Sequence, residues 1–132
     1  MRYSQTDENA AATADCLIID CFGLLSSIYQ YGQIAYIGGG FGVGIHNVPE
    51  AAVYGIPVIF GPNYKKFREA KTLTAAGGAF SINDISEFEA LMKHLENDPS
   101  YRLQCGEIAA EYIYSNTGAT KKILDDIAPV LQ

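Results

Sequence analysis

Short apolar runs alternate with stretches of helical spacing along most of this chain. The runs at residues 16–19, 34–37, 58–60 and 79–82 are largely apolar and are each followed by a turn residue, as expected for parallel strands covered on both faces. Each helical stretch between them, at residues 24–31, 48–54 and 64–76, is closed by a glycine, a common stop signal. Because parallel strands need crossover connections, this order predicts an α/β fold with a Rossmann-like, doubly wound parallel sheet.

The C-terminal third is predicted to be helical. Apolar residues with helical spacing mark one helix, at Phe88, Leu91, Met92 and Leu95. Ser86 and Glu89 have the spacing of a capping box for it. Asp98 and Pro99 are expected to open the next helix, and apolar residues between 123 and 131 mark a last one.

The pattern also predicts how the chain is divided. Residues 1–15 carry little apolar pattern and are expected to form a disordered or irregular lead-in. Residues 16–132 are expected to form a partial nucleotide-sugar-binding domain. Four strands are few for a complete domain of this kind, so we expect the opening β-α unit to be missing.

Composition excludes several classes of protein. The chain has 132 residues and a net charge of −6, which fits one domain and argues against nucleic acid as a partner. Three cysteines without C-x-x-C spacing, at Cys16, Cys21 and Cys105, predict neither a disulfide framework nor a zinc site. No apolar run reaches the roughly 18 residues of a membrane span. We therefore expect a soluble, cytoplasmic chain.

A glycine-rich loop follows the second apolar run. Residues 38–50 contain five glycines and end in His46-Asn47-Val48-Pro49-Glu50. Glycines let the backbone turn sharply and approach a ligand closely. Asn47 and Glu50 have capping-box spacing, so a helix N-terminus, a favourable site for phosphate, is predicted here. The alternative is a loop that only reverses the chain.

The spacing narrows the choice of ligand. No three glycines have the dinucleotide spacing, and the P-loop lysine is missing. His46, beside free N–H groups, could donate to a phosphate or sugar oxygen. Glu50 could accept hydrogen bonds from a ribose diol or cap its own helix, and one oxygen cannot do both. No carboxylate pair suited to a divalent metal is present, so neither a metal nor another cofactor is expected.

Four of the nine basic residues lie close together, at Lys65, Lys66, Arg68 and Lys71. In an acidic chain such a cluster could attract an anionic substrate or an anionic membrane surface. The alternative is a solvated helix face paired with Glu69, except for Lys66, which is expected near the ligand crevice. Asn63 could cap the helix that follows it.

The motif order resembles one known family. Gly-Gly is followed by His46-Asn47-x-x-Glu50, then by residues 55–59 (Gly-Ile-Pro-Val-Ile), by Gly61-Pro62, and by Phe67 and Glu69. This order resembles the C-terminal half of the 3-deoxy-D-manno-octulosonic acid (Kdo) transferases, inverting glycosyltransferases of the two-domain GT-B type. The resemblance runs from about residue 19 to the C-terminus.

The resemblance implies a function in lipopolysaccharide core synthesis. It implies CMP-Kdo as donor, a lipid A precursor as acceptor, and a parent enzyme at the cytoplasmic face of the bacterial inner membrane. The acceptor site, the membrane anchor and the carboxylate expected to act as catalytic base would lie in an N-terminal domain that this chain lacks. The fragment is therefore expected to hold no catalytic residue and to be inactive alone.

The family's donor-binding positions correspond to Gly39, Gly40, His46, Asn47 and Glu50. A second set of candidates, Phe22, Gly23, Asn63 and Lys66, is matched less closely; the first two would flank the cytosine. The family commonly has glutamate at position 24, serine at 40, glycine at 45, histidine at 63 and asparagine at 66. Side-chain contacts at 24, 40, 63 and 66 therefore need not follow the family.

Two alternatives stay open at this point. One is the donor domain of a GT-B transferase or epimerase that uses a UDP-sugar, because glycine loops and helix-capping glutamates recur in that fold. The other is a non-enzymatic, flavodoxin-like binding module complete in 132 residues.

Overall fold

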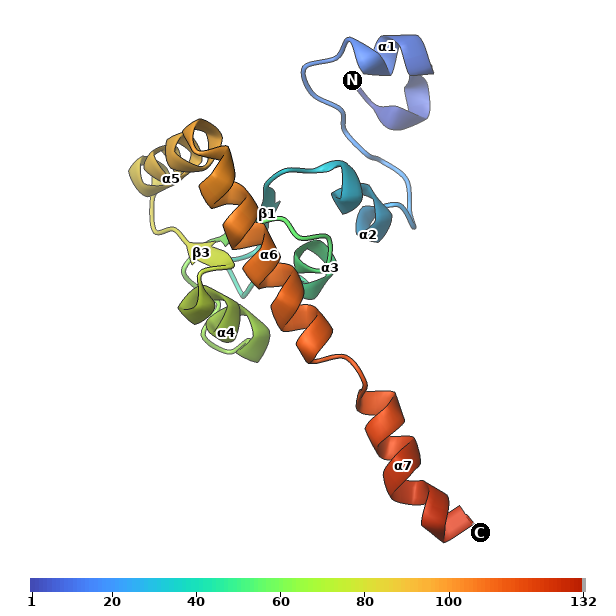
Figure 1. Cartoon of the computed structure of the whole chain (residues 1–132). Helices are drawn as coiled ribbons and strands as arrows, with labels where there is room; N and C mark the ends of the chain where they lie inside the picture. The colour runs from blue at the N-terminus through green and yellow to red at the C-terminus, as the bar shows by residue number, and fades with distance from the viewer. Residues whose placement is uncertain (132) are drawn as a thin grey trace. The chain divides into compact units, whose positions relative to one another are not determined.

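The structure is a computed structural model that describes residues 1–131. The chain divides into two compact units, Met1–Gly32 and Gln33–Gln132 (Figure 1). Each unit is described by itself below.

The first unit is built from short helical segments. They are η1 (Tyr3–Gln5), α1 (Glu8–Ala12), α2 (Leu25–Ile28) and η2 (Tyr29–Tyr31). The carboxylate of Asp20 accepts hydrogen bonds from Ser4 Oγ at 2.6 Å and Ser4 N at 3.0 Å. These bonds lower the pKa of Asp20. The lead-in expected over residues 1–15 thus contains two helical segments, η1 and α1.

The strand predicted at residues 16–19 is wrong. This run forms only an isolated bridge between Ile18 and Arg2, in which Ile18 N donates to Met1 O at 2.7 Å and Tyr3 N donates to Ile18 O at 2.8 Å. Leu17 and Ile18 are exposed. A short apolar run forms a strand only where it pairs with a sheet. Here the run pairs only with the first residues of the chain, through the bridge between Arg2 and Ile18.

The second unit contains a parallel sheet of three strands. These are β1 (Ala35–Ile37), β2 (Val58–Phe60) and β3 (Ala79–Ser81), hydrogen-bonded in the order β1-β2-β3. All three strands are short and rich in aliphatic and aromatic residues, as predicted. The α/β class with a parallel sheet and helical crossovers is confirmed, with three strands in the described chain in place of four.

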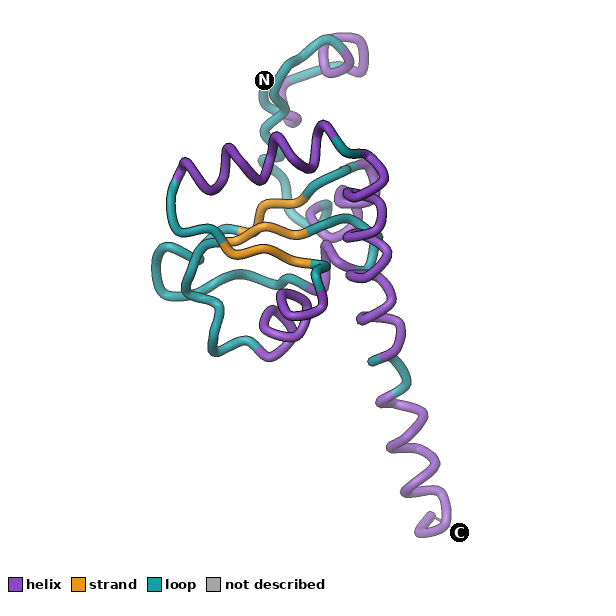
Figure 2. The backbone as a smooth tube through the Cα atoms, turned by 60° about the vertical axis from the view of Figure 1, so that its left-hand side comes forward, coloured by secondary structure: helices purple, strands orange, loops and turns teal. Residues whose placement is uncertain are grey.

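Helices cover both faces of this sheet. Figure 2 shows α5 (Ile85–Asn97) over one face and α4 (Arg68–Ala76) over the other. Ile59 of β2 packs with Ile82 and with Leu95 of α5, and all three are buried. Because side chains alternate along a strand, the neighbours of Ile59 point to the face that α4 covers. The alternation therefore explains why every residue of β2 is buried.

Helix α6 (Pro99–Ser115) packs near the amino ends of the strands. A Cβ on Gly106 would overlap the backbone of Gly55, which leads into β2, and α6 also contacts α3 (Pro49–Ala52), α4 and α5. Cys105 is buried on α6, and this burial raises its pKa. The ligand edge of the sheet, at the carboxyl ends of the strands, is thus opposite α6.

The last helix is α7 (Ala119–Leu131), which contains Pro129. Within residues 1–131, no helix is both long and apolar enough to span a membrane.

Several helix boundaries differ from the prediction. Helix α4 begins at Arg68, four residues later than predicted, because residues 62–67 form turns in which Tyr64 packs on Phe60 at 5.1 Å between ring centroids. The capping box predicted at Ser86 and Glu89 is also wrong. The residue that caps α5 is Asp84, whose carboxylate accepts from Glu87 N at 2.9 Å.

Glu87 reaches back to Asn83, the residue before the N-cap. Its Oε2 accepts a hydrogen bond from Asn83 N at 2.8 Å. Asp84 and Glu87 lie two positions before the predicted pair, Ser86 and Glu89. They cap the helix because it starts at Ile85, so that Ser86 is already inside it. The cap predicted at Asp98 is confirmed, since its carboxylate accepts from Tyr101 N at 3.0 Å.

Candidate functional site

Two loops meet where β1 and β2 end. The glycine-rich loop follows β1, and the segment that begins at Gly61 follows β2. Asn63 N donates to Gly40 O at 2.8 Å, and Asn63 Nδ2 donates to Gly42 O at 2.6 Å. Asn63 therefore holds the two loops together. The prediction that it caps the following helix is wrong, because Phe67 is the N-cap of α4 and makes no side-chain capping bond.

Gly40 and Gly61 let the loops touch. A Cβ on Gly40 would lie 2.5 Å from Gly61 N, and one on Gly61 would lie 2.6 Å from the carbonyl carbon of Gly40. Real Cβ contacts are never so short, so both positions need glycine in this arrangement. This close approach accounts for glycine at position 40, where the resembling family commonly has serine.

The loop also folds back on itself and brings His46 over Gly39. Gly39 has φ +89°, and a Cβ there would overlap the carbonyl oxygen of Gly44. His46 N donates to Gly38 O at 3.1 Å. The imidazole lies beside Gly39, because a Cβ on that glycine would be 3.5 Å from His46 Cδ2. Two predicted donor-site residues are thus neighbours.

Asn47 and Glu50 form a second pair. Asn47 Nδ2 donates to Glu50 Oε1 at 2.9 Å. The predicted capping role of Asn47 is wrong: the N-cap of α3 is Val48, and it makes no side-chain capping bond. Helix α3 starts one residue later than the spacing suggested because Pro49 takes its first position.

This arrangement leaves polar atoms available to a ligand. Among residues 1–131, no backbone or side-chain group donates to Glu50 Oε2, and the N–H groups of Asn47 and Val48 donate to no protein acceptor. Glu50 is half-buried, whereas the His46 and Asn47 side chains are exposed. The site can therefore accept hydrogen bonds from hydroxyl groups and donate them to an anion.

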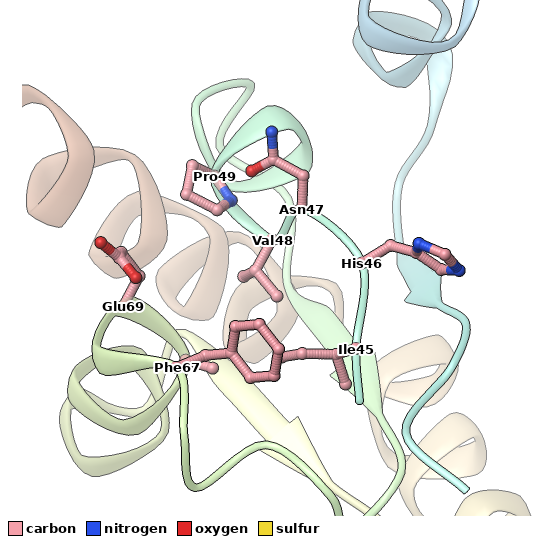
Figure 3. Close-up of a pocket in the computed structure, with 8 residues that line it drawn as sticks. Ile45, His46, Asn47, Val48, Pro49, Phe67 and Glu69 are labelled. Atoms are coloured by element: carbon pink, nitrogen blue, oxygen red, sulfur yellow. The ribbon is translucent and has the colours of Figure 1, made fainter. Parts of the chain in front are cut away.

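A hollow of about 400 Å³ opens beside these residues. Its lining consists of Ile45, His46, Asn47, Val48, Pro49, Phe67, Glu69 and Ala70. Figure 3 shows Phe67 below Val48 and Glu69 at one side, whereas the His46 ring points to the opposite side, away from Glu69. The sequence analysis named Phe67 in the motif order but did not predict that it lines this hollow together with Ile45. Phe67 and Ile45 carry no polar chemistry, and only the fold brings them together.

Lys66 lies next to this hollow and does not line it. It lines a neighbouring hollow of about 300 Å³ together with Gly42, Val43, Pro62, Asn63, Lys65 and Phe67. Phe67 is common to both hollows. Lys66 therefore lies close to Gly42 and Val43 of the glycine-rich loop, and it shares a hollow with Phe67 but not with His46 and Asn47.

Phe22, Gly23 and His94 are outside the geometry described so far. Phe22 and Gly23 belong to the unit Met1–Gly32, which is described by itself, and their contact with the cytosine stays a prediction. His94, which received no role from the sequence, stacks on Tyr101 with ring centroids 4.2 Å apart. Within residues 1–131, no three His, Cys, Asp or Glu side chains gather as metal ligands.

Several curated relatives of the chain share one name. A 3-deoxy-D-manno-octulosonic acid transferase from Aquifex aeolicus is 36% identical over 83 residues, covering 61% of this chain and 24% of that enzyme. The enzymes of that name from Bordetella pertussis and Haemophilus influenzae are 32% and 28% identical, over 84% and 96% of this chain. The chain spans about a quarter of the length of these relatives. No protein-family model matches the chain.

A solved structure shares the fold. The C-terminal CMP-Kdo binding domain of WaaA from Acinetobacter baumannii superposes with a TM-score of 0.65 at 21% sequence identity. The match covers 72% of this chain and 51% of that chain. The similarity supports the Rossmann-like α/β fold predicted from the sequence.

Proposed function

The chain belongs by sequence to the family of the Kdo transferases, and we propose that it forms the part of such an enzyme that binds the nucleotide-sugar donor, CMP-Kdo. The observation that carries the proposal is the hydrogen bond from Asn47 to Glu50, because Asn47 lines the same hollow as His46. It combines one carboxylate acceptor with several hydrogen-bond donors and no metal-ligand cluster among the described residues.

Glu50 is proposed to bind the ribose. Its Oε1 is oriented by Asn47, which leaves Oε2 to accept hydrogen bonds from the ribose hydroxyls. The sequence left two roles for this carboxylate, and the capping role would require a bond from a backbone N–H. Among residues 1–131, Glu50 accepts no such bond. Binding of the ribose by Glu50 therefore does not compete with helix capping, contrary to what the spacing of Asn47 and Glu50 suggested.

The phosphate is proposed to lie at the N–H groups of Asn47 and Val48, with His46 beside them. Helix α3 has only four residues, so its dipole contributes less than that of a full helix. The proposed interaction therefore depends mainly on the individual donors, which are the N–H groups of Asn47 and Val48 and the His46 ring. Such preorganised donors stabilise the negative charge that develops on the leaving group.

The reaction that this site would serve is glycosyl transfer with inversion. An acceptor hydroxyl oxygen forms a bond to the anomeric carbon of Kdo while the bond from that carbon to the phosphate oxygen breaks. The electron pair of that bond leaves with CMP, and the hydroxyl proton goes to a base. We propose that the base and the acceptor site lie in another domain of a longer GT-B enzyme, so that this chain alone is inactive.

The finer details of the proposal concern the parent enzyme. We propose that its acceptor is a lipid A precursor and that it works at the cytoplasmic face of the inner membrane, without a metal or another cofactor. Neither a UDP-sugar enzyme nor a non-enzymatic module is favoured by the relatives described above.

The test is transfer by the complete protein encoded by the reading frame that contains this chain. CMP-Kdo and a lipid A precursor are supplied together, and the acceptor is examined by mass spectrometry for the added mass of Kdo. A UDP-sugar replaces CMP-Kdo in the control. The proposal expects addition of Kdo only from CMP-Kdo, and transfer from the UDP-sugar instead would overturn it.

A further inference from the structure

Four cations are concentrated at the start of α4. The α4 basic cluster, defined here as Lys65, Lys66, Arg68 and Lys71, holds four of the nine basic residues of a chain whose net charge is −6. All four side chains are exposed. With Thr72 they line a hollow of about 290 Å³. Positive charge is thus gathered on one small surface of an acidic protein.

Among the described residues, no carboxylate forms an ion pair with the α4 basic cluster. Within the part of the chain that the structure describes, the only ion pair joins Lys121 to Asp125. Glu69, the obvious candidate in sequence, lines the hollow beside Val48 and Pro49 instead (Figure 3). The cluster is therefore a solvated surface, as the alternative expected, but it is not paired with Glu69. Its positive charges are therefore available to an anion from outside the protein.

The cluster is not built to hold one small anion. Among the described residues, no hydrogen bond fixes any of its four cationic groups, and the Thr72 hydroxyl already donates to Arg68 O at 3.0 Å. Long, unrestrained side chains suit a surface of many mobile anionic groups better than a single fixed phosphate.

Exposed apolar side chains adjoin the cluster. Val43, at the tip of the glycine-rich loop, is fully exposed, and Phe67 is 37% exposed. Both line one hollow with Lys65 and Lys66. Cations next to exposed apolar groups are typical of surfaces that lie on a bilayer, where the charges meet headgroups and the apolar groups reach the acyl boundary. The net charge of −6 argues against a nucleic acid as the partner of this surface.

We propose that the α4 basic cluster, with Val43 and Phe67 at its border, docks on a membrane surface that carries anionic phosphate headgroups. The inference rests on the proposed function for one point, which is that the acceptor is a lipid. Its other grounds are the positive charge of the α4 basic cluster and the exposure of Val43 and Phe67. Docking at this surface would hold the loop that carries His46 and Asn47 close to a lipid-borne acceptor.

The test measures sedimentation of the chain with vesicles. Vesicles of phosphatidylcholine alone are compared with vesicles that also contain phosphatidylglycerol. The variant K65Q/K66Q/R68Q/K71Q is compared with the control variant R2Q/K93Q/K121Q/K122Q, which removes the same one arginine and three lysines from exposed positions elsewhere. Circular dichroism and thermal melting verify that both variants fold.

We expect the unaltered chain to bind only the vesicles that contain phosphatidylglycerol, and binding to weaken as salt is raised. The cluster variant should lose binding by about tenfold or more, and the control variant by less than about twofold, because each cation near the surface contributes separately. Equal losses in the two variants would overturn the proposal. The proposal would also be overturned if the unaltered chain bound neither type of vesicle. Full displacement of the vesicles by inorganic pyrophosphate at unchanged ionic strength would likewise overturn it, because that result would indicate a site for a small anion.

Calorimetry with CMP on the unaltered chain separates the two proposals. If the chain binds CMP and no vesicle, only the docking surface is wrong. If it binds phosphatidylglycerol vesicles through the cluster and does not bind CMP, only the donor-site proposal is wrong.

Discussion

Asn47 donates a hydrogen bond from Nδ2 to Glu50 Oε1 across 2.9 Å, within one turn of chain. This bond orients the carboxylate without involving the backbone of α3, whose N-cap is Val48. A residue pair that looks like a helix cap in the sequence is therefore a side-chain pair whose second carboxylate oxygen is available to a ligand.

Replacing Glu50 by glutamine should weaken donor binding more than folding. The amide oxygen of glutamine can still accept from Asn47, so the melting temperature should change little. Loss of the charged acceptor removes a hydrogen bond worth about 1.5–3 kcal/mol, which corresponds to a loss of affinity for the donor nucleotide of roughly tenfold or more. Calorimetry and thermal melting measure the two effects.

The control for this prediction is Glu107→Gln, which changes an exposed carboxylate on α6. It should leave both affinity and melting temperature unchanged. A fall of several degrees in the melting temperature of Glu50→Gln, with unchanged affinity, would mean that Glu50 is a structural residue only.

Replacing Asn63 by alanine should loosen the connection between the two loops. The change removes the bond from Nδ2 to Gly42 O and leaves the backbone bond to Gly40 O in place. We expect a loss of stability of about 1 kcal/mol and faster hydrogen exchange at the glycine-rich loop. Hydrogen exchange that remains unchanged at residues 39–44 would show that the side chain does not restrain the loop.

Gly39 and Gly42 should respond differently to alanine. Gly39 has φ +89° and no room for a Cβ, whereas the nearest atom to a Cβ on Gly42 lies 3.7 Å away. Gly39→Ala should destabilise the chain by about 1–3 kcal/mol through strain and overlap. Gly42→Ala should change stability by less than about 1 kcal/mol. Urea titrations compare the two, and equal effects would contradict the loop conformation.

The cap of α5 offers a test of the corrected helix start. Asp84→Ala should cost about 1 kcal/mol because the first turn loses its acceptor. Ser86→Ala should have almost no effect, because Ser86 makes no capping bond in the described structure. A larger loss of stability for Ser86→Ala than for Asp84→Ala, measured by urea unfolding, would restore the capping box that the spacing first indicated.

The sequence predicted what depends on local chemistry. Apolar runs and glycine stops located the three strands, and Gly77 ends α4 in the left-handed conformation as its position indicates. The run at residues 16–19 has the same local pattern as those strands and forms none. Whether a short apolar run becomes a strand depends on a partner, and pairing is not encoded in the run itself.

The sequence indicated which residues belong to the candidate site but not which of them contact one another. His46 and Gly39 lie together because the loop folds back through the bond from His46 N to Gly38 O. The role of Asn63 could not be read from its position before a helix, because the helix starts at Arg68 and the amide reaches across to Gly42. Contacts between separate loops depend on the fold and leave no signal in local spacing.

The most direct test of the central claim is a calorimetric titration of the chain with CMP and, separately, with UDP. The account predicts that CMP binds more tightly than UDP and that Glu50→Gln reduces the affinity for CMP. UDP binding as tightly as CMP or more tightly, or no binding of CMP, would contradict the assignment of this site to CMP-Kdo.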